Sequence, residues 1–268
     1  MLVRIGCEFE YQTTGSAPSL WQVRPRPDGD QRLVSETWAP PAPARIYRDA
    51  YGNVCDRLTL PPGRSVLRYD AMVDVPSSPD DLDMSATESP LDDLPDDAFV
   101  YLLPSRFCWP DLLHDSAWEL FGSSPPGWPR VQAVCDWVHD HIRYEVGAST
   151  PLTTASDVWE SRVGVCRDFT QLGITFCRAL NVPARYVSGY LPDIGVPVPE
   201  LAMDFASWFE AWLGDRWWTF DPRNNERRVG RVVIARGRDA LDGAMVTTWG
   251  AARLETMMVW ADEVADAG

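Results

Sequence analysis

Cys166 is the residue whose place in the sequence points most directly to chemistry. It begins a segment whose apolar residues recur at helical spacing: Phe169, Leu172, Phe176 and Leu180. A thiol at a helix N-terminus lies near the positive end of the helix dipole and near free backbone N–H groups, which favours the nucleophilic thiolate. The same N–H groups could hold an oxyanion when an acyl group is attacked. The sequence therefore predicts a nucleophile at Cys166, and the alternative is burial as a small apolar side chain.

A predicted hairpin supplies the geometry for two further groups. Residues 206–220 have the pattern of two strands joined by a two-residue Gly-Asp turn. This turn pairs Leu213 with Arg216, and the same register places Asp221 diagonally opposite position 206 on one face of the hairpin. A base at position 206 could be oriented by the carboxylate of Asp221, so that cysteine, base and acid would form a thiol triad. The alternative for Asp221 is a turn residue before the proline that follows it.

Three motifs surround these positions: GVCRDF at residues 164–169, CRALNVPARYVSGY at 177–190 and MDFASWFEAWLGDRWWTFDPRNN at 203–225. Together they resemble the transglutaminase-like core of bacterial families related to papain-type cysteine proteases. The beginning of the chain resembles the β-rich region that precedes this core in many bacterial members. The resemblance implies that Cys166 is the nucleophile and that Asp221 orients an imidazole. It also implies acyl transfer through a thioester, as amide crosslinking, deamidation or peptide hydrolysis, on a peptide, a protein or an acyl-thioester or amide substrate.

The position of the general base departs from the family pattern. The family carries His-Ala-Trp where this sequence has Ala206-Ser207-Trp208, and a methyl group cannot accept a proton. Three explanations stay open. The chain could be an active-site knock-out of a working enzyme, a natural pseudoenzyme that binds a peptide or protein in the old cleft, or an enzyme whose base comes from elsewhere. Asp204 and Glu210 are weak candidates for such a base, because a carboxylate would raise the thiol pKa by like charge.

Three residues that flank these positions are the predicted substrate-binding residues: Trp208, Arg167 and Asp204. Trp208 belongs to a tryptophan-rich hairpin that could wall a groove, although most of the 13 tryptophans are expected in the core. The Pro-rich, apolar loop 192–204 leads into position 206, and we expect it to form a rim or lid over the site. This chemistry requires no metal, and neither a metal nor another cofactor is predicted.

The pattern of secondary structure places these residues in an α+β protein. Residues 1–75 consist of short apolar segments between Pro/Gly turns, which predicts a β-rich N-terminal domain. The acidic, Pro-rich residues 76–97 predict an extended, solvated linker, so that the domains run from 1 to 96 and from 97 to 268. The resemblance implies that the second domain is a transglutaminase/papain-like core in which the cysteine helix packs on an antiparallel β-sheet. Its predicted elements are helices at 131–144 and 166–180 and strands at 184–191, 206–213 and 216–220.

Composition and charge exclude several classes of partner. The 268 residues include 24 Lys and Arg and 39 Asp and Glu, which gives a formal net charge of −15. This balance argues against binding nucleic acid or an anionic membrane surface, because both require a basic face. No run of about 18 apolar residues occurs, so no membrane-spanning helix is predicted. Residues 80–97 hold eight acids and no Lys or Arg, which accounts for about half of the net charge.

The cysteines indicate a reducing compartment. There are six, and no apolar signal core precedes them, so free thiols in the cytoplasm are expected rather than disulfides. No CxxC pair occurs, and the three histidines, His114, His139 and His141, do not stand in metal-ligand spacing with cysteines. A structural zinc site is therefore not predicted.

Overall fold

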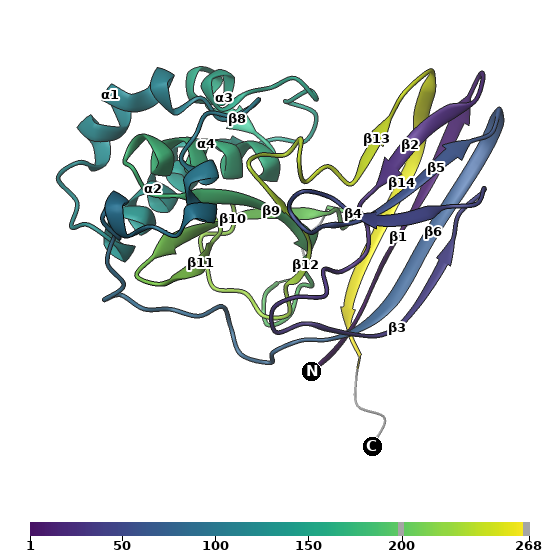
Figure 1. Ribbon diagram of the computed structural model, residues 1–268, viewed down its shortest axis with the longest axis horizontal. Coiled ribbons are helices and arrows are strands. Elements are labelled where there is room, and N and C mark those ends of the chain that lie inside the picture. Colours follow the sequence, from purple (N-terminus) through teal and green to yellow (C-terminus); the bar gives the residue numbers. More distant parts are fainter. Residues whose placement is uncertain (198–200, 265–268) are drawn as a thin grey trace.

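The computed structural model describes residues 1–197 and 201–264. Figure 1 shows helices gathered over one sheet in one part of the molecule and long paired strands in the other part. The first strands along the chain are β1 (Leu2–Thr13), β2 (Ala17–Trp21), β3 (Arg32–Ala39), β4 (Arg45–Arg48), β5 (Val54–Leu60) and β6 (Gly63–Asp74). The helices are the 3-10 helices η1 (Leu91–Asp93) and η2 (Asp96–Tyr101) and the α-helices α1 (Pro110–Phe121), α2 (Trp128–His141), α3 (Ala155–Ser161) and α4 (Cys166–Ala179). The remaining strands are β7 (Arg143–Tyr144), β8 (Val163–Gly164), β9 (Ala184–Tyr190), β10 (Ala206–Leu213), β11 (Arg216–Phe220), β12 (Val232–Gly237), β13 (Val246–Thr248) and β14 (Ala252–Glu263).

Two four-stranded sheets form the part that begins the chain, with the strand orders β14-β1-β6-β3 and β13-β2-β5-β4. Strand β6 shows how they bury an apolar core, because every second residue is buried: Leu67, Tyr69, Ala71 and Val73. Side chains alternate across a strand, so this pattern buries one face and leaves the other toward solvent. The predicted β-rich character of residues 1–75 is confirmed.

The C-terminal strands β13 and β14 return to these sheets. β14 pairs with β1 along its whole length, and β13 pairs with β2. The sequence prediction placed all of residues 97–268 in the second domain, and for these two strands the structure differs. Pairing between opposite ends of the chain uses backbone groups, which carry no sequence signal. The burial pattern of β14 is also weak, since Val259 and Ala261 are its buried residues.

The second part of the molecule is built on the antiparallel sheet β11-β10-β9-β12, and α4 packs on one of its faces (Figure 1). Gly173 of α4 lies so close to Phe209 of β10 that a Cβ on the glycine would come within 2.8 Å of the ring. A larger residue would push the helix off the sheet, because protein interiors are close-packed. The cysteine helix on an antiparallel sheet is the arrangement that the family resemblance implied.

The β10–β11 hairpin has the predicted register, in which Leu213 pairs with Arg216. Gly214 adopts a φ of 64°, which suits the first central position of a two-residue type II′ turn. The predicted helix 166–180 and strand 184–191 are also observed. The helix predicted from residue 131 begins earlier, at Trp128, and carries a proline in its first turn.

Residues 76–97, here called the connecting segment, are mostly exposed, in line with the predicted solvated linker. They contain no strand, yet their acids bind the second part of the molecule. Asp80 forms an ion pair with Arg231 at 2.8 Å, and Glu88 forms one with Arg130 at 3.0 Å. The arginine side chains are largely buried, at 7% and 8% exposed. The acids of the connecting segment are therefore anchors as well as solvated charges.

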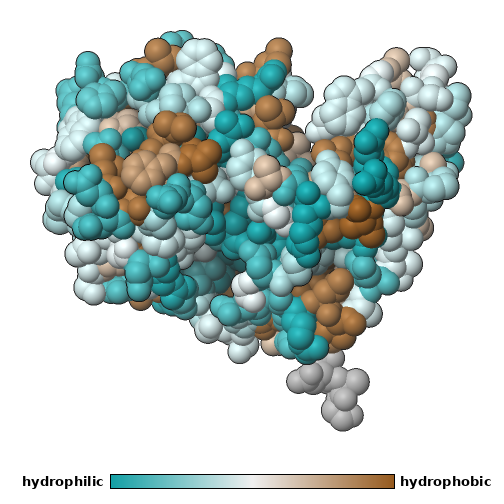
Figure 2. Space-filling model, viewed as in Figure 1, coloured by the Kyte–Doolittle hydropathy of each residue, from teal (hydrophilic) through white to brown (hydrophobic). Residues whose placement is uncertain are grey.

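An apolar core continues across the junction of the two parts. Tyr190, Phe205 and Val232 of the second part pack into the same cluster as Ile5 and Trp21 of the N-terminal sheets. Figure 2 shows hydrophilic side chains gathered on the visible surface between the two parts, with hydrophobic ones distributed over both. No helix in the described ranges is long and apolar enough to cross a membrane.

Candidate functional site

Cys166 is the first residue of α4, as predicted, and is half-buried there. The buried carboxylate of Asp168 accepts a hydrogen bond from the backbone N–H of Val165 at 2.8 Å. An acid in the first turn binds an N–H group that has no partner within the helix, and it complements the helix dipole. Short strand β8 leads into the helix and pairs Gly164 with Tyr144. These local contacts fix the thiol at the helix start.

The pKa of the Cys166 thiol is raised above its ordinary value, mainly by burial. The negative charge of Asp204 adds to this increase. The hydroxyl of Ser207, the guanidinium of Arg223 and the backbone N–H of Arg167 act in the opposite direction. The helix end that was predicted to favour the thiolate is present, and burial, the largest of the effects above, acts against the thiolate. These effects together favour the neutral thiol over the thiolate.

Cys166 lines a pocket of about 90 Å³, here called the Cys166 pocket. The pocket brings the thiol together with Ala206 and Asp204, two positions that the sequence singled out. Its other lining residues are Tyr144, Leu191, Asp193, Leu201, Ala202, Met203, Phe205, Ser207, Arg223, Asn224 and Arg228. Several of them belong to the loop 192–204 that was expected to form a rim or lid, while residues 198–200 of that loop lie outside the described residues.

Position 206 offers the pocket a methyl group in place of a base. Of the two carboxylates considered as substitutes, Glu210 is buried and forms ion pairs with Arg185 and Arg236. Burial alone would raise the pKa of Glu210, but the two guanidinium groups lower it to about 2. Asp204 does line the pocket, and burial raises its pKa. Asp204 therefore lines the same pocket as the thiol, whereas Glu210 is held in ion pairs outside that pocket.

Asp221 follows β11 and is buried. One of its carboxylate oxygens accepts hydrogen bonds from the backbone N–H groups of Arg223, at 3.2 Å, and Asn224, at 3.0 Å. The other oxygen accepts from the side-chain amide of Asn224 at 2.8 Å and from Arg231 at 2.9 Å. Asp221 is thus a turn residue, as the alternative had it, and these four hydrogen bonds also hold its buried carboxylate in one position. Because Asn224 lines the Cys166 pocket, it links Asp221 to the pocket rim.

Arg167 and Trp208 do not belong to the pocket lining. The Arg167 side chain forms an ion pair with its neighbour Asp168. Trp208 is 1% exposed, and the guanidinium carbon of Arg231 lies 4.7 Å from the centroid of its ring. Of the three residues predicted to bind substrate, Asp204 is the one that the structure brings to the thiol.

The three histidines do not line the Cys166 pocket. The ring nitrogen Nδ1 of His139 lies 3.0 Å from the backbone carbonyl oxygen of Arg223. His141 stacks on Trp137, and His114 is exposed on α1. Within residues 1–197 and 201–264, no group of three or more His, Cys, Asp or Glu side chains is placed to hold a metal ion.

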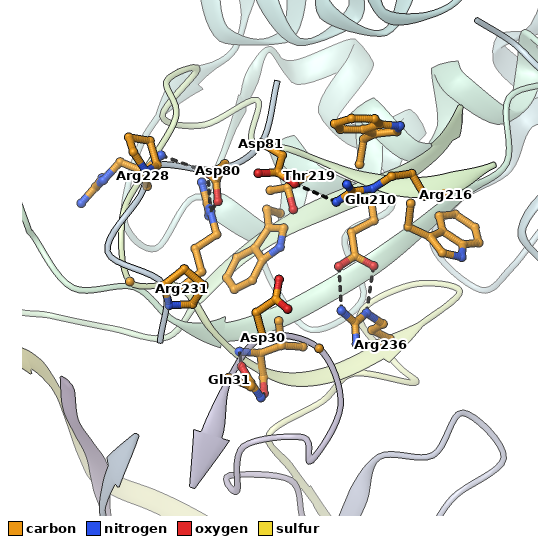
Figure 3. Close-up of a pocket in the computed structure, with 18 of the residues that line it drawn as sticks. Asp30, Gln31, Asp80, Asp81, Glu210, Arg216, Thr219, Arg228, Arg231 and Arg236 are labelled. Carbon is orange, nitrogen blue, oxygen red and sulfur yellow. Dashed lines mark hydrogen bonds and ion pairs between the residues drawn. The ribbon is translucent and has the colours of Figure 1, made fainter. Parts of the chain in front are cut away.

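A larger pocket, of about 420 Å³, lies on the face of the sheet that α4 does not cover (Figure 3). It is lined by charged residues and tryptophans, including Trp208, and it does not reach Cys166. Many of its charges pair with one another: Glu210 with Arg236, Asp81 with Arg216, and Asp80 with Arg231. Although this pocket has the greater volume, its described lining contains no reactive thiol, so it is not the site of thiol chemistry.

Sequence reasoning missed Asn224, Arg223 and Arg231 as residues of the site. Asn224 carries a usable signal, because an asparagine three residues after an aspartate in a turn can bind its carboxylate. Arg223 stands in the same turn but binds the Asp221 carboxylate through its backbone N–H, so its residue type gives no signal. Arg231 carries no such signal, because nothing in the sequence near it distinguishes it from the other Lys and Arg residues.

Comparisons with known proteins connect the motifs to one family. Residues 119–222 match the family model described as the transglutaminase-like superfamily. An uncharacterized protein of Mycobacterium tuberculosis is 30% identical over 242 residues, which span 82% of this chain and 77% of that protein. An uncharacterized protein of Mycobacterium leprae is 32% identical over 117 residues, which span 42% of either chain. A crystal structure of a "putative cysteine protease" from Cytophaga hutchinsonii is 31% identical with a TM-score of 0.89, covering 100% of this chain and 92% of that one.

A cysteine helix on an antiparallel sheet, in a fold shared over the full chain with the Cytophaga protein, places this molecule in the papain-like class of folds. Within that class, the chain belongs to the transglutaminase-like superfamily. The resemblance carried by the three sequence motifs is therefore confirmed for the family and the fold.

Proposed function

We propose that this chain is a transglutaminase-like cysteine enzyme that transfers or hydrolyses acyl groups through a thioester on Cys166. One observation carries the proposal. Cys166 at the start of α4 and position 206 at the start of β10 line the same pocket, and Asp221 is bonded to the rim residue Asn224. The substrate is a protein or peptide with an amide or thioester acyl group, the class that a transglutaminase-like fold suggests. Because residue 206 is alanine, the chain as it stands turns over slowly.

The proposed reaction has two steps at the thiol. The sulfur of Cys166 attacks the carbonyl carbon, the thiol proton passes to a base, the C–N bond of the amide breaks, and the amine leaves with a proton. Water or an amine then attacks the thioester and releases the thiol. Backbone N–H groups at the start of α4 would bind the oxyanion in both steps. The missing part is the base, and its loss from related sites lowers the rate by several orders of magnitude.

Binding without turnover is the alternative function. Two observations favour it: position 206 offers no proton acceptor, and burial raises the pKa of the Cys166 thiol. In that case the pocket holds a peptide or protein partner without reacting. Neither Ala206→His nor Cys166→Ala would then change partner binding much.

Acylation by p-nitrophenyl acetate separates the two functions. The parent chain, Ala206→His and the double variant Ala206→His/Cys166→Ala are compared for the burst of p-nitrophenolate and for the acylated residue by peptide mass. We expect Ala206→His to acylate Cys166 at least about 10²-fold faster than the parent at pH 7, which is the contribution of a positioned general base. The double variant should show no burst. Equal rates in the parent and Ala206→His would contradict the proposal and favour the binding function.

A further inference from the structure

Asp80, Arg231 and Asp221 form a chain of ion pairs from the connecting segment to the Cys166 site. Arg231 donates through Nε to both carboxylate oxygens of Asp80, at 3.0 and 2.8 Å, and through Nη2 to Asp221 at 2.9 Å. The exposed fractions of the side chains are 14% for Asp80, 7% for Arg231 and 2% for Asp221. Figure 3 shows Asp80 and Arg231 next to each other at one side of the larger pocket. Asp80 belongs to the acidic segment that was expected to be solvated.

Further contacts fix this trio in place. The guanidinium of Arg231 lies over the ring of Trp208, at 4.7 Å from its centroid. The Asp80 carboxylate also accepts a hydrogen bond from the backbone N–H of Arg228 at 2.9 Å. The backbone N–H of Asp80 donates a hydrogen bond to the backbone carbonyl of Arg228 at 3.0 Å. The connecting segment is therefore held to the loop between β11 and β12 by backbone and side chain at one residue.

The balance of charge in the trio depends on Asp80. Two carboxylates share one guanidinium, so the ionised trio carries a net charge of −1. Without Asp80, Arg231 and Asp221 would form a neutral pair. A neutral pair would stabilise an imidazolium at position 206 less than the trio does, because charge interactions are strong where water is largely excluded.

We infer that Asp80 is a positioning residue of the Cys166 site, acting through Arg231 to hold the Asp221 carboxylate in place and to keep its charge available to an imidazole at position 206. This inference rests on the proposed function. It assigns the connecting segment a role in the chemistry of the second part of the molecule. The adjacent acid provides the contrast, because Asp81 and its partner Arg216 are 61% and 52% exposed. A pair that exposed is screened by water and contributes little.

The test is the pH dependence of Cys166 alkylation by iodoacetamide, measured by peptide mass in the Ala206→His protein. Three further proteins add Asp80→Asn, the matched control Asp81→Asn, or the conservative Asp80→Glu to the same background. Cys177 is 1% exposed and serves as a reporter in each sample, because it reacts only where α4 opens.

We expect Asp80→Asn to move the acid limb of the Cys166 profile to lower pH by at least about half a unit, because removing a carboxylate charge makes proton loss from the thiol and the imidazolium easier; this is roughly threefold in rate on that limb. Asp81→Asn should leave the limb in place, and Asp80→Glu should restore it toward that of Ala206→His. Equal profiles for Asp80→Asn and Asp81→Asn would overturn the inference and leave the proposed function standing. Labelling of Cys177 without a shift of the limb would assign Asp80 a purely structural role and overturn the inference as well. If Ala206→His gains no reactivity at acidic pH, the proposed function and the inference both fail.

Discussion

At the scale of single residues, Asp204 is the group whose charge acts most directly on the nucleophile. The second carboxylate in the Cys166 pocket, Asp193, pairs with Arg228, whereas Asp204 has its pKa raised by burial and itself raises the thiol pKa. We therefore expect Asp204→Asn to lower the pKa of Cys166. Alkylation at pH 8 should become faster by roughly two- to tenfold, as measured by peptide mass.

The opposite result would assign Asp204 a different role. If Asp204 accepts the thiol proton in place of the missing base, Asp204→Asn should slow both alkylation and acylation of Cys166. The buried Cys177 in the same sample controls for unfolding, because its rate should stay unchanged in either case. Slower reaction at Cys166 alone would thus favour the changed mechanism.

Ala206 suggests a second prediction at this scale. Ala206 lines the pocket of about 90 Å³ and marks the position where the base would stand. We expect free imidazole to accelerate the acylation of Cys166 in the parent chain, with a rate that saturates as the pocket fills, because bound imidazole can accept the thiol proton. The measurement is the p-nitrophenyl acetate burst against imidazole concentration. Ala206→Leu fills the same space and should abolish the effect; equal acceleration in both proteins would show that imidazole acts from solution.

At the scale of elements, the close approach of α4 to β10 sets the position of the thiol. A Cβ at Gly173 would come within 2.8 Å of the Phe209 ring, whereas a Cβ at Gly15 would meet no heavy atom within 4 Å. Gly173→Ala should therefore lower the free energy of unfolding by about 1–3 kcal/mol, as overpacking does. Gly15→Ala should change it by less than about 0.5 kcal/mol, as at most surface sites. Urea unfolding of both variants checks this, and equal stabilities would contradict the packing of helix on sheet.

The elements that carry the site were predictable because their signals are local. The Gly-Asp turn set the register of Leu213 with Arg216, and apolar spacing marked the helix that begins at Cys166. The surroundings of the elements were not predictable in the same way. Trp208 shares a strand face with Ala206, as expected, but that face also covers the larger pocket and Trp208 turns toward it. Alternation along a strand tells which residues share a face, and it does not tell what lies opposite.

At the scale of the whole molecule, Glu210 joins strands of the core sheet to the N-terminal part. It forms ion pairs with Arg185 and Arg236, and Arg236 also pairs with Asp28 at 3.0 Å. Glu210→Gln leaves two guanidinium groups, 17% and 13% exposed, without their carboxylate, so we expect a loss of roughly 3–5 kcal/mol in unfolding free energy at pH 7. Glu255→Gln, whose partner is exposed, should cost less than about 1 kcal/mol.

The pH dependence of this loss follows from the pKa of Glu210, which is lowered to about 2 in the folded protein. A depressed pKa stabilises the fold above the ordinary range of a glutamic acid, near 4.5, and the stabilisation is lost as the pH falls toward 2. The difference between parent and Glu210→Gln should therefore shrink over that window in urea unfolding. A difference that stays constant with pH would contradict the ion-paired state of Glu210.

The features that sequence reasoning did not reach are contacts between distant parts of the chain. Asp80 and Arg231 are 151 residues apart, and β14 returns to β1 from the opposite end of the sequence. The raised pKa of Cys166 belongs to the same group, because it depends on burial by the assembled pocket. Local patterns report helices, strands and turns, whereas ion pairs across the fold and desolvation exist only once the elements have packed.

The alkylation rate of Cys166 against pH, in the parent chain and in Ala206→His, tests most directly whether this is a thiol acyl-transfer site that lacks its base. We predict that the parent rate rises with pH through a thiol pKa above the ordinary 9.0, because burial disfavours the thiolate. Ala206→His should react much faster below pH 7, because an imidazolium would pair with the thiolate. Two equally slow profiles, with Cys166 reacting no faster than the buried Cys177, would contradict the assignment of Cys166 as a nucleophile.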